Sequence, residues 1–479
     1  MSVGKETANR SSWAILGILS CLGLIVMFDE TMILPAIPDF IQNFNISYST
    51  SSWLLSAYII AAAVMTPIGG KLSDIYGKKR ILLAIMATYT IGIVLGRFAT
   101  NIEFMLVARA LQGIGMAMFP IAFGVIREVL PENKFATGQT IFSSTFPAGA
   151  ILGLIGGAAI IQNFGWSATF LAILPVAIVL WVIIFKFLHV KSLVQENSIL
   201  KQRQTLDITG TMSLASAIIL FLSGVTFLES GALELIATLF AASVASLVLF
   251  ILIEKRAASP LLDFSLMRSK SFLPPTIVLM LTFLSIFMVY ITIPVLVRSP
   301  KPLGFGGDAL AVAEVQLPFM IVFLISTIMS GFVLNKIKNT RLTLIGTVIS
   351  TMGFAFLFLF SSTSEMVSVG LTILAVGLSL SITGGFNTIL VSVPISITGV
   401  ALGMTLLLNL VGMSVGPAVS GIIQQLYQGT VDGVVGYFPT HVSYDVIFIT
   451  AALISIASVL LALLTSKNEL AVPNVENSH

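Results

Sequence analysis

The amino-acid sequence predicts an all-α polytopic membrane protein, and three observations carry this prediction. Of the 479 residues, 57% are hydrophobic and 9% are charged, whereas a soluble domain carries about 25% charged residues. The apolar residues form runs of about 20 residues, the length that a helix needs to cross a bilayer. Lys and Arg gather in short clusters between these runs, as they do in cytoplasmic loops.

Polar or Gly/Pro-rich breaks separate fourteen expected membrane helices. They cover residues 13–38, 51–70, 80–99, 103–127, 137–161, 167–188, 207–228, 232–253, 272–297, 309–334, 342–361, 365–390, 397–424 and 444–466. With a cytoplasmic N-terminus, every second loop collects most of the 24 Lys and Arg residues, which agrees with the positive-inside rule. We therefore expect an uncleaved first helix, a location in the cell membrane, and both termini in the cytoplasm.

Composition also excludes several classes of protein. The net charge of +3 is small and scattered, so no basic face for nucleic acid is expected. A single cysteine, Cys21, and three histidines outside the apolar runs argue against disulfides within the chain and against a metal centre. The sequence has no G-x-x-x-x-G-K-[ST] loop, so ATP is not the expected energy source. With no catalytic nucleophile in view, we expect neither an enzyme nor a cofactor.

A short charged turn separates the second and third expected helices, and it reads GKLSDIYGKKR from Gly70 to Arg80. Gly70 and Gly77 permit close approach and a sharp turn, and Asp74 can accept hydrogen bonds. The basic cluster that holds the next helix on the cytoplasmic side consists of Lys78, Lys79 and Arg80. The pattern resembles the G-x-L-a-D-r-x-G-r-[kr]-[kr] loop of the major facilitator superfamily. A generic positive-inside loop would explain the basic residues but not the two glycines and the acid.

Charged side chains inside the expected helices are candidates for function, because each costs at least about 2.5–3.5 kcal/mol in hydrocarbon. Asp29 lies about 24 Å along the helix from Trp13, in the outer third of the membrane. Its stretch resembles the family's first-helix signature D-x-T-[IV]-v-N-v-A-L-P, with Leu34 and Pro35 as departures. The resemblance implies a carboxylate that binds substrate or proton. Glu30 is a second candidate. The alternative for both acids is a place at the outer rim of a shorter first helix, and for Glu30 this alternative is the favoured interpretation.

Arg109 and Gln112 belong to a stretch of the fourth expected helix that resembles the superfamily motif l-x-x-x-R-x-x-q-G-x-g-a. Helical spacing puts Arg109, Gln112 and Gly113 on one face, and Gly113 leaves room for a neighbouring backbone or a substrate. A buried guanidinium stays charged, so it would favour proton loss from an approaching carboxyl group and proton uptake on separation. The alternative is a structural arginine paired with backbone carbonyls.

Glycines recur at three- and four-residue spacing in the fifth expected helix, at Gly149, Gly153, Gly156 and Gly157. Such spacing forms a groove for a neighbouring helix. The run resembles the antiporter motif g-x-x-x-G-P-x-x-G-G, although Leu154 replaces the proline. The thirteenth expected helix echoes it, with a polar residue one turn earlier: Asn409, Gly412, Gly416 and Pro417. Glu314, in the tenth, is a candidate second-half carboxylate, with a solvated cap as its alternative.

The resemblance implies a major facilitator fold of two six-helix bundles plus two inserted helices, as in the fourteen-span drug:proton antiporter family. The corresponding segments are a cytoplasmic N-terminus at 1–12, a first bundle at 13–188, a cytoplasmic linker at 189–206, an inserted pair at 207–253, a cytoplasmic loop at 254–271, a second bundle at 272–466, and a cytoplasmic tail at 467–479. Repeats of this kind are typical of secondary transporters.

The function that the resemblance implies is proton-coupled efflux of hydrophobic or cationic compounds by alternating access, with the Gly70–Arg80 loop stabilising one state. The expected partners are a small-molecule substrate, protons and the lipid bilayer, and we expect a functional monomer. An uptake symporter or facilitator for a small metabolite is the first alternative. A non-transporting membrane sensor is the second, although the chain offers only short hydrophilic stretches for a soluble output domain.

Overall fold

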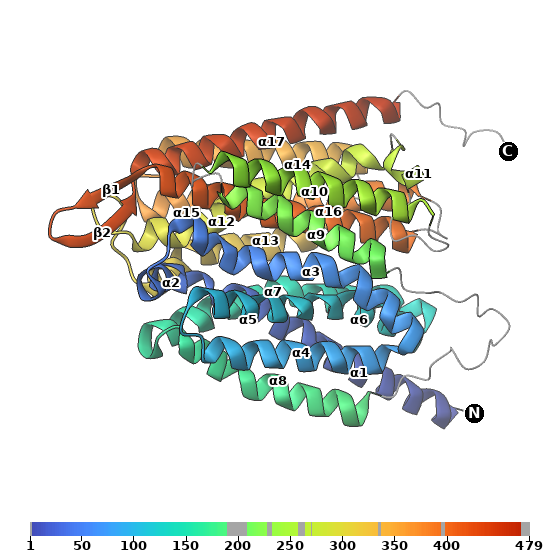
Figure 1. Cartoon of the computed structure of the whole chain (residues 1–479). Helices are drawn as coiled ribbons and strands as arrows, with labels where there is room; N and C mark the ends of the chain where they lie inside the picture. Colours follow the sequence, from blue (N-terminus) through green and yellow to red (C-terminus); the bar gives the residue numbers. More distant parts are fainter. Residues whose placement is uncertain are drawn as a thin grey trace. The chain divides into compact units, whose positions relative to one another are not determined.

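The computed structural model describes residues 2–188, 208–227, 232–256, 264–269, 271–333, 337–393 and 398–470. The chain divides into two compact units. The first comprises residues 1–260 and 308–313, and the second comprises residues 261–307 and 314–479. Figure 1 shows the long helices from which both units are built.

The first unit contains twelve helical segments among the described residues. They are α1 (Ser2–Met32), the 3-10 helix η1 (Leu34–Ala36), α2 (Ile37–Phe44), α3 (Tyr48–Tyr76), α4 (Lys78–Arg97), α5 (Ile102–Gly113), the 3-10 helix η2 (Ile114–Ala117), α6 (Met118–Val129), α7 (Glu132–Phe164), α8 (Ser167–Phe187), α9 (Ile208–Thr226) and α10 (Leu233–Glu254). Local sequence sets several starts. The Ser47 hydroxyl caps α3 by accepting a hydrogen bond from the Thr50 amide, and the Asn101 side chain caps α5 in the same way.

The second unit contains the remaining helices and a small sheet. They are α11 (Phe264–Met267), α12 (Leu273–Arg298), α13 (Ala309–Val333), α14 (Asn339–Phe360), α15 (Ser364–Ser392), α16 (Thr398–Leu426), β1 (Gln428–Val431), β2 (Val434–Pro439) and α17 (His441–Leu470). The first residues of α13, through Ala313, fall in the first unit. The strands β1 and β2 pair antiparallel as a hairpin between α16 and α17.

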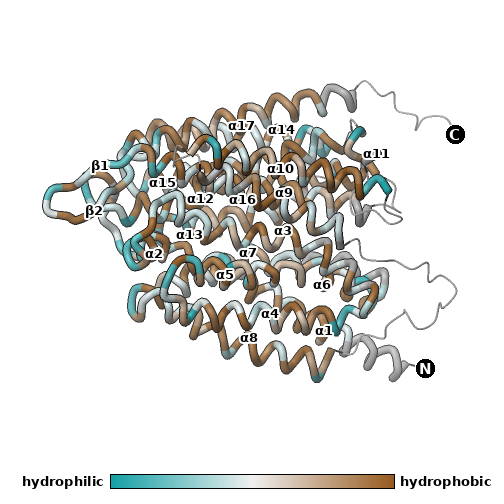
Figure 2. The backbone as a smooth tube through the Cα atoms, viewed as in Figure 1, coloured by the Kyte–Doolittle hydropathy of each residue, from teal (hydrophilic) through white to brown (hydrophobic). Residues whose placement is uncertain are grey.

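The expected membrane helices are present. Among the described residues, 13 helices are long and apolar enough to cross a membrane, and α9 adds a shorter apolar stretch at Thr209–Phe221. Figure 2 shows brown, hydrophobic stretches along these helices and teal, hydrophilic residues at the connections. The prediction of an all-α polytopic membrane fold is therefore confirmed.

Two local features differ from the sequence prediction. The first expected span, 13–38, is broken, because α1 ends at Met32 and a 3-10 turn with Pro35 near its start leads into α2. Proline lacks the amide hydrogen that would continue a helix, so the departure at Pro35 explains the break. The hairpin β1–β2 was not expected. Its turn contains Asp432 and Gly433, and Gly433 has a φ of 78°, a conformation that glycine adopts without strain.

The same pattern of helix contacts occurs within each of the two units. In the first unit α1 packs against α7, and α4 packs against α5 and α8. In the second unit α12 packs against α16, and α14 packs against α15 and α17. The internal repeat that the glycine patterns indicate is therefore visible in the packing of each unit.

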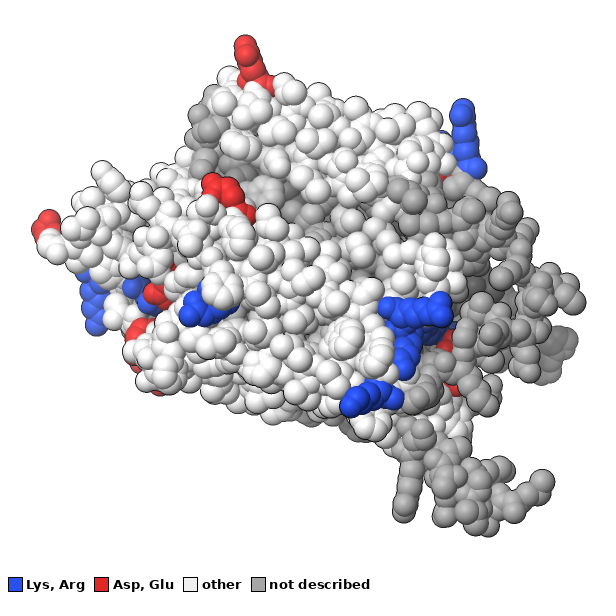
Figure 3. Space-filling model, turned by 60° about the horizontal axis from the view of Figure 1, so that its bottom comes forward, with Lys and Arg blue, Asp and Glu red and all other residues white. Residues whose placement is uncertain are grey.

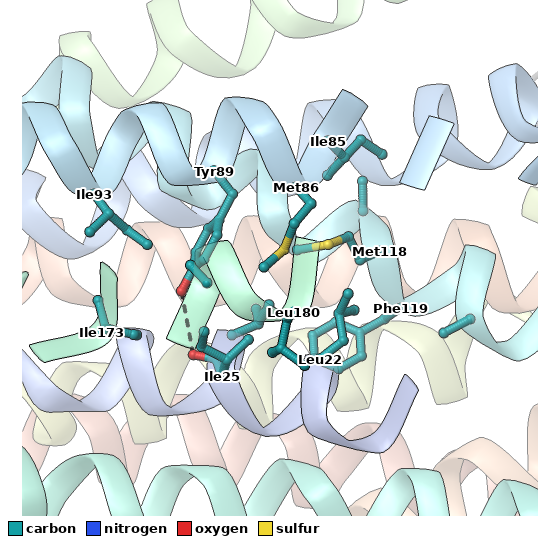
Figure 4. Packing of buried hydrophobic residues seen from close by; sticks show 14 of the residues in the cluster. Leu22, Ile25, Ile85, Met86, Tyr89, Ile93, Met118, Phe119, Ile173 and Leu180 are labelled. Carbon is teal, nitrogen blue, oxygen red and sulfur yellow. Dashed lines mark hydrogen bonds between the residues drawn. The ribbon is translucent and has the colours of Figure 1, made fainter. Parts of the chain in front are cut away.

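The core of the first unit is a continuous cluster of buried apolar side chains. Figure 4 shows part of it, where Tyr89 lies among Ile25, Ile93 and Ile173, and its hydroxyl donates a hydrogen bond to the Ile25 carbonyl at 3.4 Å. This packing fixes α1 against α4 and α8 immediately beside the charged residues of α1. The polar site is therefore held by a rigid apolar frame.

Candidate functional site

The structure brings Asp29, Gln112 and Arg109 together in the interior of the first unit. All three side chains are fully buried, with 0% exposure. The Gln112 side-chain amide donates a hydrogen bond to Asp29 Oδ1 at 3.0 Å, and Arg109 Nη1 lies 3.7 Å from Asp29 Oδ2. Arg109 Nη1 also donates to Gln112 Oε1 at 3.1 Å. An acid of α1 and a base of α5 thus form one buried network.

The orientation of the Gln112 amide follows from the chemistry of its neighbours. A guanidinium only donates hydrogen bonds, and an ionised carboxylate only accepts them. Gln112 must therefore turn its oxygen to Arg109 and its NH2 group to Asp29. This arrangement makes Gln112 a bridge between the two charges.

Backbone and aromatic groups of α3 complete the surroundings of Arg109. Its Nε donates to the Leu54 carbonyl at 3.1 Å, and its guanidinium carbon lies 4.5 Å from the centre of the Tyr58 ring, which is favourable cation–π geometry. Arg109 thus pairs with the carboxylate of Asp29, as the functional hypothesis expects, and also with a backbone carbonyl, as the alternative of a structural arginine expects. Sequence reasoning missed Tyr58, because an aromatic residue inside an apolar run gives no signal of a polar role.

Gly113 sets how closely α3 and α5 approach each other. A Cβ atom at this position would collide with the carbonyl group of Tyr58. The sequence predicts that Gly113 leaves room for either a neighbouring backbone or a substrate. The structure shows a neighbouring backbone there, that of α3. The close approach brings the Leu54 carbonyl and the Tyr58 ring within reach of Arg109.

The two remaining acidic candidates lie in different surroundings. Glu30 is buried, with 3% exposure, and its Oε2 atom accepts no hydrogen bond from the described residues. Glu30 is therefore enclosed by protein, although α1 ends two residues later at Met32. Its depth in the membrane and its role stay predictions. Glu314 is exposed on α13. This exposure agrees with the solvated-cap alternative, and a contribution of Glu314 to a cavity or to proton binding stays a prediction.

The glycines of α7 pack directly against α1. A Cβ atom at Gly149 would lie 2.7 Å from the Leu24 carbonyl oxygen, and one at Gly157 would lie 2.5 Å from Met32 Cα. Gly153 meets the Phe28 carbonyl and the Thr31 hydroxyl, and Gly156 meets the Phe28 ring. The helix that carries Asp29 therefore lies in a groove made by these glycines.

Thr31 fastens α1 to α7 next to that groove. Its hydroxyl lies 3.0 Å from the Ala150 carbonyl oxygen, to which it donates a hydrogen bond. The bond crosses between the helices two residues after Asp29. The same O–H group can also donate to the Met27 carbonyl of α1 at 3.1 Å, so the contact with Ala150 adds one polar link between the two helices beside Asp29.

The glycines of α16 repeat this arrangement against α12. Gly412 meets the Met280 carbonyl, and a Cβ atom at Gly416 would lie 2.5 Å from the Leu284 carbonyl oxygen. Pro417 lies inside α16. One turn before Gly412, Asn409 is buried, and both of its side-chain amide atoms lack a hydrogen-bond partner among the described residues.

The repeated contacts identify the second-unit counterparts of the charged residues. Gly149 and Gly153 meet the carbonyls of Leu24 and Phe28, as Gly412 and Gly416 meet those of Met280 and Leu284. Asp29 therefore corresponds to Ser285. By the same reasoning, Gly92 meets Ala108 and Gln112 as Gly346 meets Gly377 and Ser381, so Arg109 corresponds to Leu378. The second unit has no charge at either position.

The charged turn forms contacts within the first unit. Gly77 has a φ of 94°, which confirms the sharp turn, and Lys78 forms an ion pair with Glu128 of α6. Lys79 Nζ lies 5.9 Å from the centre of the Phe185 ring, and Arg80 is exposed. Glu128 was not expected from the sequence, because an acid at a helix end is ordinary.

Two expectations for the charged turn have other outcomes. No described atom lies within 4 Å of a Cβ built at Gly70, so the close approach expected there is corrected. The side chain of Asp74 lies outside what the structure describes.

Elsewhere, charged side chains are sparse. The central part of the face in Figure 3 carries almost no coloured residues, as expected for surface that faces lipid. Among the described residues, no group of three or more His, Cys, Asp or Glu side chains could hold a metal ion. The Asp29–Gln112–Arg109 network is therefore the polar centre on which we base the function.

Comparison with known proteins agrees with the geometry. The family model of the Major Facilitator Superfamily matches residues 19–417. The chain is 27% identical over 444 residues to the multidrug efflux pump LfrA of Mycolicibacterium smegmatis, covering 91% of this chain and 86% of that protein. It is 26% identical over 376 residues to multidrug resistance protein 3 of Bacillus subtilis, covering 77% and 70%.

Solved structures show the same fold. A mutant of the nucleoside transporter NupG superposes with a TM-score of 0.67 at 14% identity, covering 94% of this chain and 99% of that chain. The peptide-transporter-family member PepTSo has a TM-score of 0.67 at 13% identity, covering 96% and 99%. Together with the family match over most of the sequence, these findings show that the chain belongs to the Major Facilitator Superfamily of membrane transporters.

Proposed function

We propose that this protein exports hydrophobic, cationic compounds in exchange for protons, by alternating access. The observation that carries the proposal is the buried network of Asp29, Gln112 and Arg109 inside membrane-spanning helices. A charge at such depth is costly unless it is paired. It is retained where a transporter must bind a proton or an ion.

The network supports coupling between proton transfer and helix movement. While Asp29 lies beside Arg109, its ionised form is favoured by the guanidinium and by the Gln112 amide. If α1 and α5 move apart, the carboxylate loses both partners and gains from binding a proton. Proton binding at Asp29 and the separation of two helices would then favour each other.

Relatives and charge support the class of compound. LfrA and multidrug resistance protein 3 are named as a multidrug efflux pump and a drug resistance protein, and a relative of 24% identity from Streptomyces glaucescens is named as a tetracenomycin C resistance and export protein. Around the network, two buried acids, Asp29 and Glu30, face one buried base, Arg109. An excess of acid favours a positively charged substrate.

We further propose the arrangement in the membrane. The domains follow the segments expected from the sequence, and both termini lie in the cytoplasm. The protein lies in the plasma membrane and works as a monomer. It leaves its substrate chemically unchanged. The Gly70–Arg80 turn stabilises one state. The ion pair between Lys78 and Glu128 supports this role, because it ties the turn to the end of α6.

An uptake symporter is the second candidate. The observation in its favour is Leu154, which occupies the position of the antiporter-motif proline and lies buried inside the uninterrupted helix α7. The direction of proton movement distinguishes the two candidates.

The test is transport in liposomes that contain a pH-sensitive dye. With an imposed proton gradient, we expect ethidium, a lipophilic cation, to move in one direction and protons in the other, and Asp29→Asn to abolish the coupled proton flux. If cations do not move, or if they move together with protons, the exporter proposal fails. Parallel movement would support the symporter.

A further inference from the structure

We propose that Gln316 and Tyr290 form a binding subsite in the second unit, where the Gln316 side-chain oxygen accepts a hydrogen bond from an aromatic amine of the exported compound. This inference rests on the proposed function and deepens it. It names a class of compound, planar cations that carry N–H groups on their rings, and it assigns part of their recognition to an uncharged site.

The first step concerns the burial of Gln316 on α13. Its side chain is 2% exposed, and its Oε1 atom accepts no hydrogen bond from the described residues. A buried carbonyl oxygen without a partner costs free energy. A group that donates a hydrogen bond to this oxygen would remove that cost.

The second step concerns the orientation of the amide. The Gln316 Nε2 atom lies 3.4 Å from the Tyr290 carbonyl oxygen of α12, to which it donates. A backbone carbonyl only accepts hydrogen bonds, so Gln316 must turn its NH2 group to it. The oxygen therefore points away from that carbonyl. The remaining face of the amide is an acceptor, and its ligand must supply an N–H or O–H group.

The third step concerns the space beside the amide. Gln316 lines a cavity of about 10 Å³ together with Tyr290 and Phe319, which is room for one group of the size of a water molecule. An amino group on an aromatic ring has this size. Asn409, whose amide atoms also lack partners, does not line this cavity.

The space distinguishes Gln316 from serines of the second unit whose hydroxyls also lack a partner among the described residues. A Cβ atom at Gly377 would lie 2.5 Å from Ser350 Oγ, and one at Gly346 would lie 2.6 Å from Ser381 Oγ. These hydroxyls lie in the tight contact between α14 and α15, which leaves no room for a ligand.

The fourth step concerns a row of aromatic rings on α12. Phe283, Phe287 and Tyr290 follow one another at helical spacing, and all three are partly exposed. The ring centres of Phe283 and Phe287 lie 6.5 Å apart, and those of Phe287 and Tyr290 lie 5.3 Å apart. Aromatic surfaces of this kind bind flat rings and cations. Because Tyr290 ends the row and also lines the cavity, a planar cation on these rings can direct an amino group to Gln316.

The internal repeat relates this subsite to the charged site of the first unit. Since Asp29 corresponds to Ser285, Glu30 corresponds to Ile286, and Ile286 lines the cavity. The second unit thus has a small cavity with a hydrogen-bond acceptor beside the position that carries an acid in the first unit.

Two probes separate the hydrogen bond from charge and ring shape. Ethidium carries amino groups on its rings, and 5-ethyl-6-phenylphenanthridinium has the same rings and charge without them. Calorimetric titration of the purified protein in detergent gives both dissociation constants. We expect the parent and the exposed control Gln42→Met to bind ethidium about tenfold more tightly than the analogue. Gln316→Met should bind both about equally, whereas Gln316→Glu, which keeps an acceptor oxygen, should keep the preference.

The outcomes separate this inference from the proposed function. If Gln316→Met keeps the preference of the parent, or if the parent binds both probes equally, the subsite is overturned and the cavity holds water only, while the proposed function stands. If the parent binds neither probe and transports no lipophilic cation, the proposed function fails. Size-exclusion profiles show whether each variant folds. If Gln316→Met does not fold, loss of the preference in Gln316→Glu overturns the subsite.

Discussion

Gln112 connects the two charges of the buried network, because a side-chain amide has one face that donates and one that accepts. It takes a hydrogen bond from Arg109 at 3.1 Å and gives one to Asp29 at 3.0 Å. A carboxamide carries no charge, so it links the ions without adding to the charge that must be buried. Small changes at this position should therefore affect both ions together.

We expect Gln112→Leu to destabilise the protein by about 1–3 kcal/mol, because Asp29 and Arg109 each lose a hydrogen-bond partner in a buried site. The measurement is the midpoint of thermal unfolding at a fixed heating rate in detergent. Gln42→Leu on α2, whose side chain is exposed, is the matched control. Equal midpoints for Gln112→Leu and the parent would show that the bridge does not support the site.

The sequence identifies the ions of the site but not their surroundings. Asp29 and Arg109 stand out because charged residues are rare in membrane helices, and Gln112 follows from its position one turn after Arg109. Tyr58 and the Leu54 carbonyl give no such signal, since one is an ordinary apolar-run residue and the other is backbone. Their place beside Arg109 depends on the approach of α3 to α5 at Gly113.

At the scale of elements, the glycine grooves of α7 and α16 hold the first helix of each unit. We expect Gly149→Ala and Gly416→Ala to cost about 1–3 kcal/mol each, since the added methyl groups meet backbone carbonyls of α1 and α12. Thermal midpoints are compared with Gly17→Ala, where no described atom lies within 4 Å of the new methyl group. Similar midpoints for all three variants would contradict the packing role.

The ion pair between Lys78 and Glu128 ties the charged turn to α6. Its side chains are 15% and 26% exposed, so we expect Lys78→Glu to cost about 0.5–1 kcal/mol and to change the rate of transport. The charge-swapped double variant, Lys78→Glu with Glu128→Lys, should recover most of the loss. If the double variant is no better than the single one, the pair does not act as a latch for the turn.

The membrane helices could be predicted from the sequence, because each one is a long apolar run. Two connections could not be predicted: the break after Met32 and the hairpin β1–β2. The break after Met32 depends on Pro35, which the sequence marked as a departure without showing whether the helix bends or ends. The hairpin β1–β2 follows from Asp432 and Gly433 between valines, a signal of a two-residue turn. Strand pairing of so few residues is easily overlooked beside twenty-residue apolar helices.

At the scale of the whole molecule, the two units share a skeleton but differ in charge. The contacts of α1 with α7 recur in α12 with α16, yet Ser285 and Leu378 stand where the first unit has Asp29 and Arg109. The buried polar residues with free hydrogen-bonding atoms in the second unit include Asn409, which can bind a ligand without titrating.

This difference leads to a prediction for a chimera. If residues 272–466 are replaced by the equivalent segment of LfrA, we expect the range of exported compounds to change while the number of protons that enter per exported molecule stays that of the parent. The measurement is proton flux in liposomes over a panel of lipophilic cations of known charge. A changed proton ratio would show that the second half also takes part in coupling.

The uncharged counterparts Ser285 and Leu378 also bear on how such a protein can evolve. The two units share one scaffold, and at these two positions the first unit has an acid and a base where the second has uncharged residues. Under the proposed function, the charged pair of the first unit couples export to protons. Substitutions in the second unit can then change which compounds are recognised, because they leave Asp29, Gln112 and Arg109 unaltered. Resistance to a new compound could arise by mutation in the second half of the gene alone, at no loss of driving force.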